Sequence, residues 1–227
     1  MTKPEPLTAL FQDEFLLVLD KPEGLLSVPG RGADKQDCLS RRAQQVWPDA
    51  LVLHRLDMAT SGLILMARNL AVQRALGDAF AQRTVHKRYQ AVVQGTLAPA
   101  EHWGLIDLPI AVDWPNRPLR IIDPVAGKAS STRWRVLPGD ERWRAFATAD
   151  VAAVANCTRL ELEPLTGRSH QLRVHLRALG HPILGDRLYS DDVTRPGSTR
   201  LLLHACSLKL AHPVTGEWLR FDSPCPF

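Results

Sequence analysis

A polar segment between two short apolar runs places the strongest constraint on this chain. Leu51–Leu53 and Leu63–Ala67 are short and apolar, and each is typical of a buried β-strand. The segment between them contains Arg55 and Asp57. A polar loop held between two core strands is a favourable place for chemistry. A carboxylate withdrawn from water needs a cationic or hydrogen-bonding partner, so we expect Asp57 to have such a partner elsewhere in the chain. The alternative is a turn capped by Asp57, with Arg55 on the surface.

Length and charge set broad limits on the class of protein. A chain of 227 residues can bury a substantial core in a single domain. The formal net charge of +4 is a mild basic bias that is compatible with a polyanionic partner. A solvated surface of mixed charge explains the same bias equally well.

The cysteines and the chain start bear on compartment and cofactors. The four cysteines form no C-x-x-C pair and have no nearby histidine in a zinc pattern: Cys38, Cys157, Cys206 and Cys225. We interpret them as reduced thiols. The sequence has no signal peptide pattern and no apolar run of membrane-spanning length. We therefore expect a cytoplasmic protein that binds no membrane and needs no metal or cofactor.

The hydrophobic pattern predicts a mixture of strands and helices. We expect a flexible lead-in over residues 1–10 and a single domain over residues 11–227, and we assign no role to the alanine-rich segment Ala149–Asn156. Strands are predicted at Phe15–Asp20, Val85–Gln94, Ala129–Val136 and Thr158–Glu163, with a closing hairpin over His212–Phe221. Helices are predicted from a cap at Asp37 to Trp47, from a cap at Asn69 to about Gln82, and from about Ser169 to Leu179 before Gly180.

The last of these helices offers a partner for Asp57. Leu172, Leu176 and Leu179 recur at helical spacing and should face the core. Arg173 falls on another face, together with His170 and Arg177. An arginine on that face could enter a cleft and hold a carboxylate ionised through charge-assisted hydrogen bonds. The alternative is a solvated helix face.

Two other segments combine basic and aromatic side chains. Tyr89 follows Lys87 and Arg88 on a predicted strand, although a lone strand tyrosine is more often part of the core. The segment Asp113–Arg120 contains two prolines and should form a rigid loop. In this loop Trp114, Arg117 and Arg120 could bind RNA by stacking and phosphate contacts. Packing of Trp114 into the core is an equally good interpretation.

Several motifs of the chain resemble those of one enzyme family. His54-Arg55-Leu56-Asp57, followed by Thr60-Ser61-Gly62-Leu63, resembles the catalytic motif of the RluA family of pseudouridine synthases. Lys21–Leu25 resembles the first motif of that family, and Thr166–His175 resembles its arginine motif, with Ser169 and Leu172 where Thr and Ile are usual. Gly180–Tyr189 and Leu201–Ala205 also match, so the resemblance extends from Lys21 to Phe221.

This resemblance implies a fold and a reaction. The fold would be α+β, the pseudouridine synthase catalytic core: a mixed, largely antiparallel sheet with flanking helices and a central cleft. No accessory N-terminal RNA-binding domain is expected. The reaction would convert specific uridines to pseudouridine in structured RNA, in a tRNA anticodon stem-loop, in 23S ribosomal RNA, or in both. The partner would be RNA and not DNA, and we expect a monomer.

The resemblance also implies roles for individual residues. Asp57 would act on the nucleoside, by attack at C1′, by addition at C6, or as a base toward a glycal intermediate. Arg173 would pair with Asp57, and Tyr89 would stack on the uracil. Arg55 would fill the space left when the target base leaves its stack, and Leu203 would pack beneath the uracil. RNA backbone contacts are expected from Lys87, Arg88, Arg117, Arg120 and Arg168.

Two other classes of function stay open at this point. A nucleoside or glycoside hydrolase would share a carboxylate near the sugar but usually needs a second one, for which Glu161, Glu163 and Asp186 are available. A non-catalytic RNA-binding module would explain the basic bias. It would not explain an acidic residue in an otherwise neutral-to-basic site.

Overall fold

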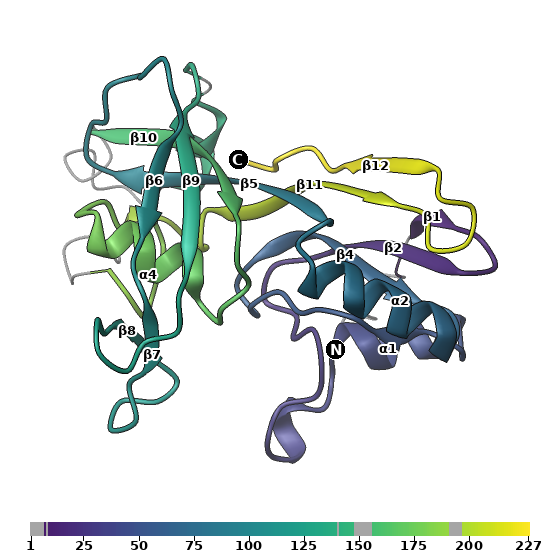
Figure 1. Ribbon diagram of the computed structural model, residues 1–227. Helices are drawn as coiled ribbons and strands as arrows, with labels where there is room; N and C mark the ends of the chain where they lie inside the picture. Colours follow the sequence, from purple (N-terminus) through teal and green to yellow (C-terminus); the bar gives the residue numbers. More distant parts are fainter. Residues whose placement is uncertain (1–6, 8, 140, 148–155, 191–196) are drawn as a thin grey trace. The chain divides into compact units, whose positions relative to one another are not determined.

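The chain forms two compact units, which we describe separately (Figure 1). The computed structural model describes residue 7 and residues 9–139, 141–147, 156–190 and 197–227. Unit 1 comprises Met1–His86 and Ala205–Pro224, and unit 2 comprises Lys87–His204 and Cys225–Phe227. Each unit is therefore assembled from segments that lie far apart in the sequence.

Unit 1 is built on a sheet with the strand order β1-β2-β4-β11. β3 pairs with β4 and β12 pairs with β11, and the pairs β1/β2, β2/β4, β3/β4 and β11/β12 are all antiparallel. The strands are β1 (Ala9–Gln12), β2 (Leu16–Lys21), β3 (Leu51–Val52), β4 (Ser61–Ala67), β11 (Leu203–Ala211) and β12 (Trp218–Asp222). The hairpin predicted at the chain end is confirmed, with Gly216 in its turn at φ 73°.

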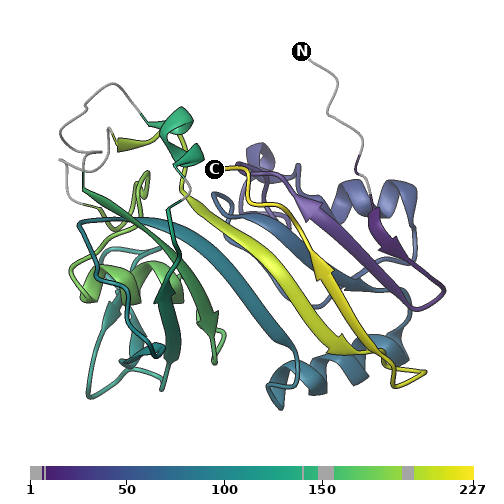
Figure 2. The ribbon, with the colours of Figure 1, turned by 90° about the horizontal axis from the view of Figure 1, so that it is seen from above.

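The continuous apolar sequences of β2 and β4 arise because both strands are covered on both faces. Successive side chains of a strand point to opposite faces of the sheet. Helix α2 (Leu70–Ala81) covers one face and α1 (Leu39–Val46) covers the other (Figure 2). The α2 side buries Leu16, Val18, Leu63 and Leu65, and the α1 side buries Leu17, Leu19, Ile64 and Met66.

The two helix caps predicted in unit 1 had different outcomes. Asn69 caps α2 as predicted, because its side chain accepts a hydrogen bond of 2.9 Å from the backbone N–H of Val72. The prediction for α1 was wrong, since Cys38 is the N-cap residue and makes no side-chain cap bond. Asp37 instead receives two hydrogen bonds, of 2.7 and 2.6 Å, from the guanidinium of Arg42.

Unit 2 is built on an antiparallel sheet with the order β5-β10-β9-β6 (Figure 1). The predicted strands are confirmed to within two residues, whereas β6, β7 and β8 were not predicted. The elements are β5 (His86–Gln94), β6 (Gly104–Asp107), β7 (Ile110–Val112), β8 (Arg120–Ile122), β9 (Ser131–Val136), β10 (Cys157–Pro164) and α4 (Gln171–Ala178), with β7 and β8 as a separate hairpin. Short 3-10 helices occupy Ala33–Lys35 in unit 1 and Arg142–Phe146 in unit 2.

Helix α4 is shorter than the sequence pattern suggests. It begins at Gln171, two residues after the predicted start, because His170 adopts a left-handed conformation with φ 57°. It ends at Ala178, so Leu179 is the C-cap residue and is 38% exposed. The prediction that Leu179 faces the core was therefore wrong. Gly180 terminates the helix as predicted, with φ 85°.

The remaining predictions on the fold concern its class and the chain ends. The α+β class with a largely antiparallel sheet is confirmed. The lead-in over residues 1–10 lies mostly outside the described residues, but its last two residues belong to β1, which pairs with β2. Of Ala149–Asn156, only Asn156 is described. No helix in the described ranges is long and apolar enough to span a membrane.

Gly62, at the start of β4, provides a test of this packing. Its φ is 111°, and a Cβ atom there would lie 2.3 Å from the carbonyl oxygen of Ala205. We expect Gly62→Ala to lower the free energy of unfolding by about 2–4 kcal/mol, from backbone strain and overpacking. Urea denaturation followed by circular dichroism measures this loss.

Gly77→Ala is the matched control, because Gly77 lies in α2 and a Cβ there meets no atom within 4 Å. It should raise the free energy of unfolding by about 1 kcal/mol through helix propensity. Equal effects of the two substitutions would contradict the described approach of β4 to Ala205.

Candidate functional site

Asp57 lies in the loop between β3 and β4 of unit 1, as the sequence predicts. Its side chain is half-buried, whereas Arg55 is exposed and Leu56 is buried. The carbonyl group of Asp57 accepts a hydrogen bond of 3.0 Å from the backbone N–H of Thr60, which closes a turn. Leu56 thus anchors the loop in the core, with Asp57 beside it at the edge of the core.

The first motif and Ser27, two residues after it, hold the backbone on both sides of Asp57. On one side, the hydroxyl of Ser27 donates to the carbonyl of Leu56 at 2.7 Å and accepts from the Leu56 N–H at 3.1 Å. On the other side, the carbonyl of Met58 accepts from the Gly24 N–H at 2.9 Å. The two motifs that resemble the RluA family are therefore joined in space through Gly24 and Met58, and Ser27 holds the other neighbour of Asp57, Leu56.

Lys21 completes this attachment from the end of β2. Its side chain is 0% exposed, and its ammonium group donates to the carbonyl oxygens of Pro22, Leu25 and Met58 at 2.8, 2.7 and 3.1 Å. These contacts match the three donors of an ammonium group. The sequence reasoning missed this role, although a lysine directly after the apolar run Phe15–Asp20 was a usable signal.

His54 is a second structural contact of the loop. Its Nε2 atom accepts a hydrogen bond of 3.0 Å from the backbone N–H of Leu65 in β4. The imidazole therefore carries its proton on Nδ1 when it is neutral. Its ring also packs against Phe80 of α2, with 5.0 Å between the centroids. His54 thus ties the loop to β4 and α2.

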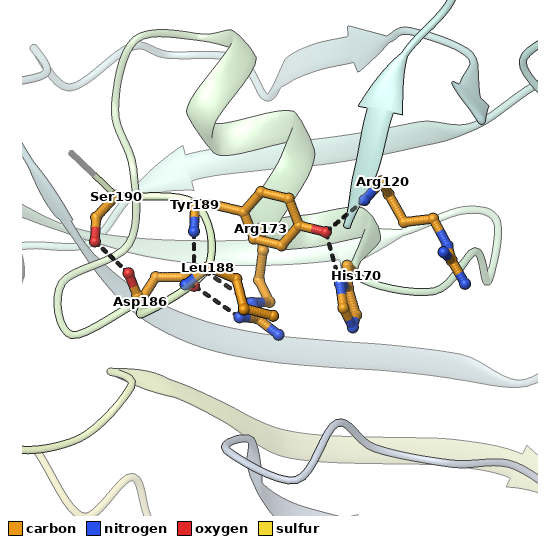
Figure 3. Close-up of polar contacts among 7 residues, drawn as sticks. All are labelled: Arg120, His170, Arg173, Asp186, Leu188, Tyr189 and Ser190. Atoms are coloured by element: carbon orange, nitrogen blue, oxygen red, sulfur yellow. Dashed lines mark hydrogen bonds and ion pairs between the residues drawn. The ribbon is translucent and has the colours of Figure 1, made fainter. Parts of the chain in front are cut away.

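In unit 2, Arg173 forms a buried ion pair with Asp186 (Figure 3). The Nε and Nη2 atoms of Arg173 donate to the two carboxylate oxygens at 2.8 and 2.7 Å, and the two side chains are 5% and 0% exposed. The carboxylate also accepts from the backbone N–H groups of Leu188 and Tyr189. Asp186 was not identified from the sequence as the partner of Arg173, and the pairing of Arg173 with Asp57 stays a prediction.

β5 separates the basic residues near Tyr89 onto two faces. Lys87 and Tyr89 lie on one side of the strand and Arg88 on the other, because side chains alternate. Burial lowers the pKa of Lys87 below its usual value. Arg88 lies 3.5 Å from Glu163 and 4.5 Å from the ring centroid of Trp103. Arg88 therefore belongs to a cluster on the sheet face opposite to Tyr89.

The loop between β7 and β8 presents an exposed aromatic residue. Trp114 is 66% exposed, and the guanidinium carbon of Arg117 lies 4.7 Å from its ring centroid. The alternative that Trp114 packs into the core is therefore wrong. The Nη1 atom of Arg120 donates to the carbonyl groups of Pro118 and Leu119, within its own loop.

The other predicted site residues occupy distinct surroundings. Leu203 is buried at the start of β11, and Tyr89 is half-buried. Arg168 is exposed in the turn before α4, where its Nε donates to the carbonyl of Ala129 at 3.4 Å. Among the described residues, no group of three or more histidine, cysteine, aspartate and glutamate side chains could hold a metal ion.

The buried ion pair predicts a large effect of one substitution. Arg173→Met would leave the Asp186 carboxylate buried without its cation, so we expect a loss of about 3–5 kcal/mol in the free energy of unfolding. Arg177→Met is the control, because Arg177 is exposed one turn further along α4; it should change this energy by less than about 0.5 kcal/mol. Thermal and urea denaturation measure both, and equal losses would contradict the buried pair.

Comparisons with known proteins identify the family of the chain. The family model described as RNA pseudouridylate synthase matches residues 15–178. The chain is 45% identical over 221 residues to "Dual-specificity RNA pseudouridine synthase RluA" of Escherichia coli (strain K12), covering 97% of this chain and 94% of that protein. The protein of the same name from Yersinia pestis is 42% identical, covering 97% of this chain and all of that protein.

Solved structures show the same likeness. The structure of human RNA Pseudouridylate Synthase Domain Containing 1 is similar with a TM-score of 0.76 and 28% identity, covering 100% of this chain and 87% of that chain. Human RNA Pseudouridylate Synthase Domain Containing 4 gives a TM-score of 0.70 and 26% identity, covering 96% and 88%. The chain therefore belongs to the RNA pseudouridylate synthase family.

Proposed function

We propose that this protein isomerises specific uridines to pseudouridine in tRNA and in ribosomal RNA. Two relatives are named as dual-specificity RNA pseudouridine synthases, and the match covers 94% or more of each, which supports action on two kinds of RNA. The choice of tRNA and ribosomal RNA follows the resemblance of the sequence motifs to the RluA family. In the reaction the C1′–N1 bond breaks, the uracil turns, and a C1′–C5 bond forms. The C5 hydrogen leaves as a proton and N1 gains one, so no redox partner or energy source is required.

The observation that carries this proposal is the set of hydrogen bonds that holds the backbone on both sides of Asp57. Hydrogen bonds to Leu56 and Met58 restrain the backbone on both sides of the carboxylate, and Asp57 itself is half-buried. A catalytic group must be held close to its productive geometry by its surroundings. We infer that Asp57 is the group that acts on the nucleoside, with Arg173 and Tyr89 as the other catalytic residues.

The RNA-binding roles follow from exposure and charge. Arg55 is exposed two residues before Asp57, which supports a role in filling the space that the extruded base leaves. The stacked pair of Trp114 and Arg117 supports contacts to bases and phosphates of an RNA loop. Arg168 is exposed and supports a phosphate contact. We propose that the protein acts as a monomer in a reducing, cytoplasmic compartment; the compartment is in line with four cysteines that form no disulfide in the described part of the chain.

The hydrolase alternative is weakened by the carboxylates of unit 2. Such an enzyme needs a second carboxyl group to handle water or the leaving group. Asp186 is ion-paired with Arg173, Glu161 with Arg135 at 2.5 Å, and Glu163 with Arg133 at 3.2 Å. The three acidic residues available to a hydrolase are thus held by arginines.

Asp57→Asn tests the proposal. Unmodified tRNA and 23S rRNA transcripts carrying tritium at uracil C5 should release tritium with the wild-type protein, because bond formation at C5 expels that atom, and no free uracil should appear. Asp57→Asn should release none, while its RNA affinity stays within about threefold, because only the chemical step is lost. Single-turnover tritium release and filter binding measure the two quantities.

Asp78→Asn is the matched control, since Asp78 is exposed on α2 of the same unit, and it should leave both quantities unchanged. Tritium release by Asp57→Asn at the wild-type rate would exclude Asp57 as the essential group. Free uracil with the wild-type protein would favour a hydrolase.

A further inference from the structure

Tyr189 joins two elements of unit 2 through its hydroxyl group (Figure 3). The side chain is 2% exposed. Its oxygen accepts a hydrogen bond of 2.9 Å from the backbone N–H of Arg120, the first residue of β8. The same oxygen lies 2.6 Å from Nδ1 of His170, the N-cap residue of α4. The phenol therefore bridges β8 to the start of the helix that carries Arg173.

The chemistry of the phenol satisfies both contacts at once. A tyrosine hydroxyl has one donor and can also accept. The oxygen accepts from the Arg120 N–H, and it bonds Nδ1 of His170 either by donating its own proton or by accepting the Nδ1 proton, according to the tautomer of the imidazole. In either case the contact fixes the position of the His170 ring.

His170 holds a backbone conformation that needs such support. Its φ of 57° is in the left-handed region, which costs a non-glycine residue on the order of 1 kcal/mol or more. His170 directly precedes Gln171, and Arg173 is the third residue of α4. A shift of His170 would therefore move the first helical turn and the side chain of Arg173 with it.

The ring of Tyr189 supports Arg173 directly. The guanidinium carbon of Arg173 lies 5.0 Å from the ring centroid of Tyr189, within the range of a cation–π contact. The Asp186 carboxylate binds the edge of the same guanidinium through Nε and Nη2. The ring is itself held in an apolar cluster with Ile110 and Val174. Asp186 and Tyr189 thus restrain Arg173 from two sides.

We propose that Tyr189 is a positioning residue of the pseudouridine synthase reaction, which holds Arg173 through its ring and, by way of His170, through the first turn of α4. The expected effect of Tyr189 on the reaction rate rests on the proposed function. The structural part of the inference, the restraint of the Arg173 guanidinium, is independent of activity. The two parts are therefore measured separately.

Tyr189→Phe tests the hydroxyl and keeps the ring. We expect the single-turnover rate at a temperature well below every melting point to fall about tenfold, with the RNA Kd within about twofold of wild type, because only the geometry of a catalytic side chain changes. In arginine-labelled protein, the Nε–H signal of Arg173 should exchange with solvent about tenfold faster, because the first turn opens more often.

Two further variants separate this role from general stability. Thr158→Val also removes one buried bridging hydroxyl of unit 2, which donates to the Gly95 carbonyl at 2.7 Å and accepts from the Leu97 N–H at 2.9 Å. Thr158→Val should lower the melting temperature about as much as Tyr189→Phe does. It should leave the single-turnover rate and the exchange of the Arg173 Nε–H unchanged. His170→Asn keeps a residue that tolerates the left-handed region but removes the imidazole, so it should reproduce the effects of Tyr189→Phe.

The outcomes are distinct. An unchanged Arg173 exchange rate in Tyr189→Phe would overturn the part of the proposal that depends on the hydroxyl group. An equal loss of catalytic rate in Thr158→Val would overturn the specific role of Tyr189. If His170→Asn shows the wild-type single-turnover rate and the wild-type Arg173 exchange rate, the restraint of Arg173 by way of His170 is overturned. A wild-type protein that makes no pseudouridine would defeat the proposed function, while the exchange of Arg173 would still report whether Tyr189 restrains it.

Discussion

The candidate site of unit 1 depends on the hydrogen bonds that the buried ammonium group of Lys21 donates to three backbone carbonyl oxygens. A buried charge is costly unless polar groups surround it, and here three backbone carbonyl oxygens do so. Two of them belong to the turn after β2, and the third belongs to Met58, next to Asp57. One side chain therefore ties the end of a core strand to the loop that carries the carboxylate. Ser27 adds the same restraint on the other side of Asp57.

In unit 2, an ion pair and a cation–π contact restrain the guanidinium group of Arg173. Arg173 is restrained by a carboxylate at its edge and by an aromatic ring against its face. In both units the restraining group is itself buried: Lys21 is 0% exposed and Asp186 lies in a turn closed by the N–H groups of Leu188 and Tyr189. In unit 1 the buried group restrains the backbone beside Asp57, and in unit 2 it restrains the Arg173 side chain itself. A charged group held in place by buried partners is preorganised, which is the condition for electrostatic catalysis.

Much of this arrangement could be predicted from local sequence. The two-sided burial of β2 and β4 follows from their continuous apolar runs, and Asn69 is identified as a cap by its position. The contacts of Lys21 were missed because its partners are backbone carbonyls, which carry no sequence signature; only its position directly after an apolar run pointed to its burial. The pair of Arg173 and Asp186 joins a helix to a later turn, and periodicity does not report such contacts. His170 departs from the helical pattern by adopting a left-handed conformation, and its hydrogen bond with Tyr189, a residue distant in sequence, is not visible in the local pattern.

Nucleoside analysis of the product RNA tests the central claim most directly. Unmodified tRNA and 23S rRNA transcripts are incubated with the wild-type protein without added metal, digested to nucleosides and separated by liquid chromatography with mass detection. The account predicts that each mole of uridine lost appears as one mole of pseudouridine, of identical mass but different retention, with no free uracil. Uridine loss matched by free uracil, or RNA binding with no change in nucleosides, would contradict it.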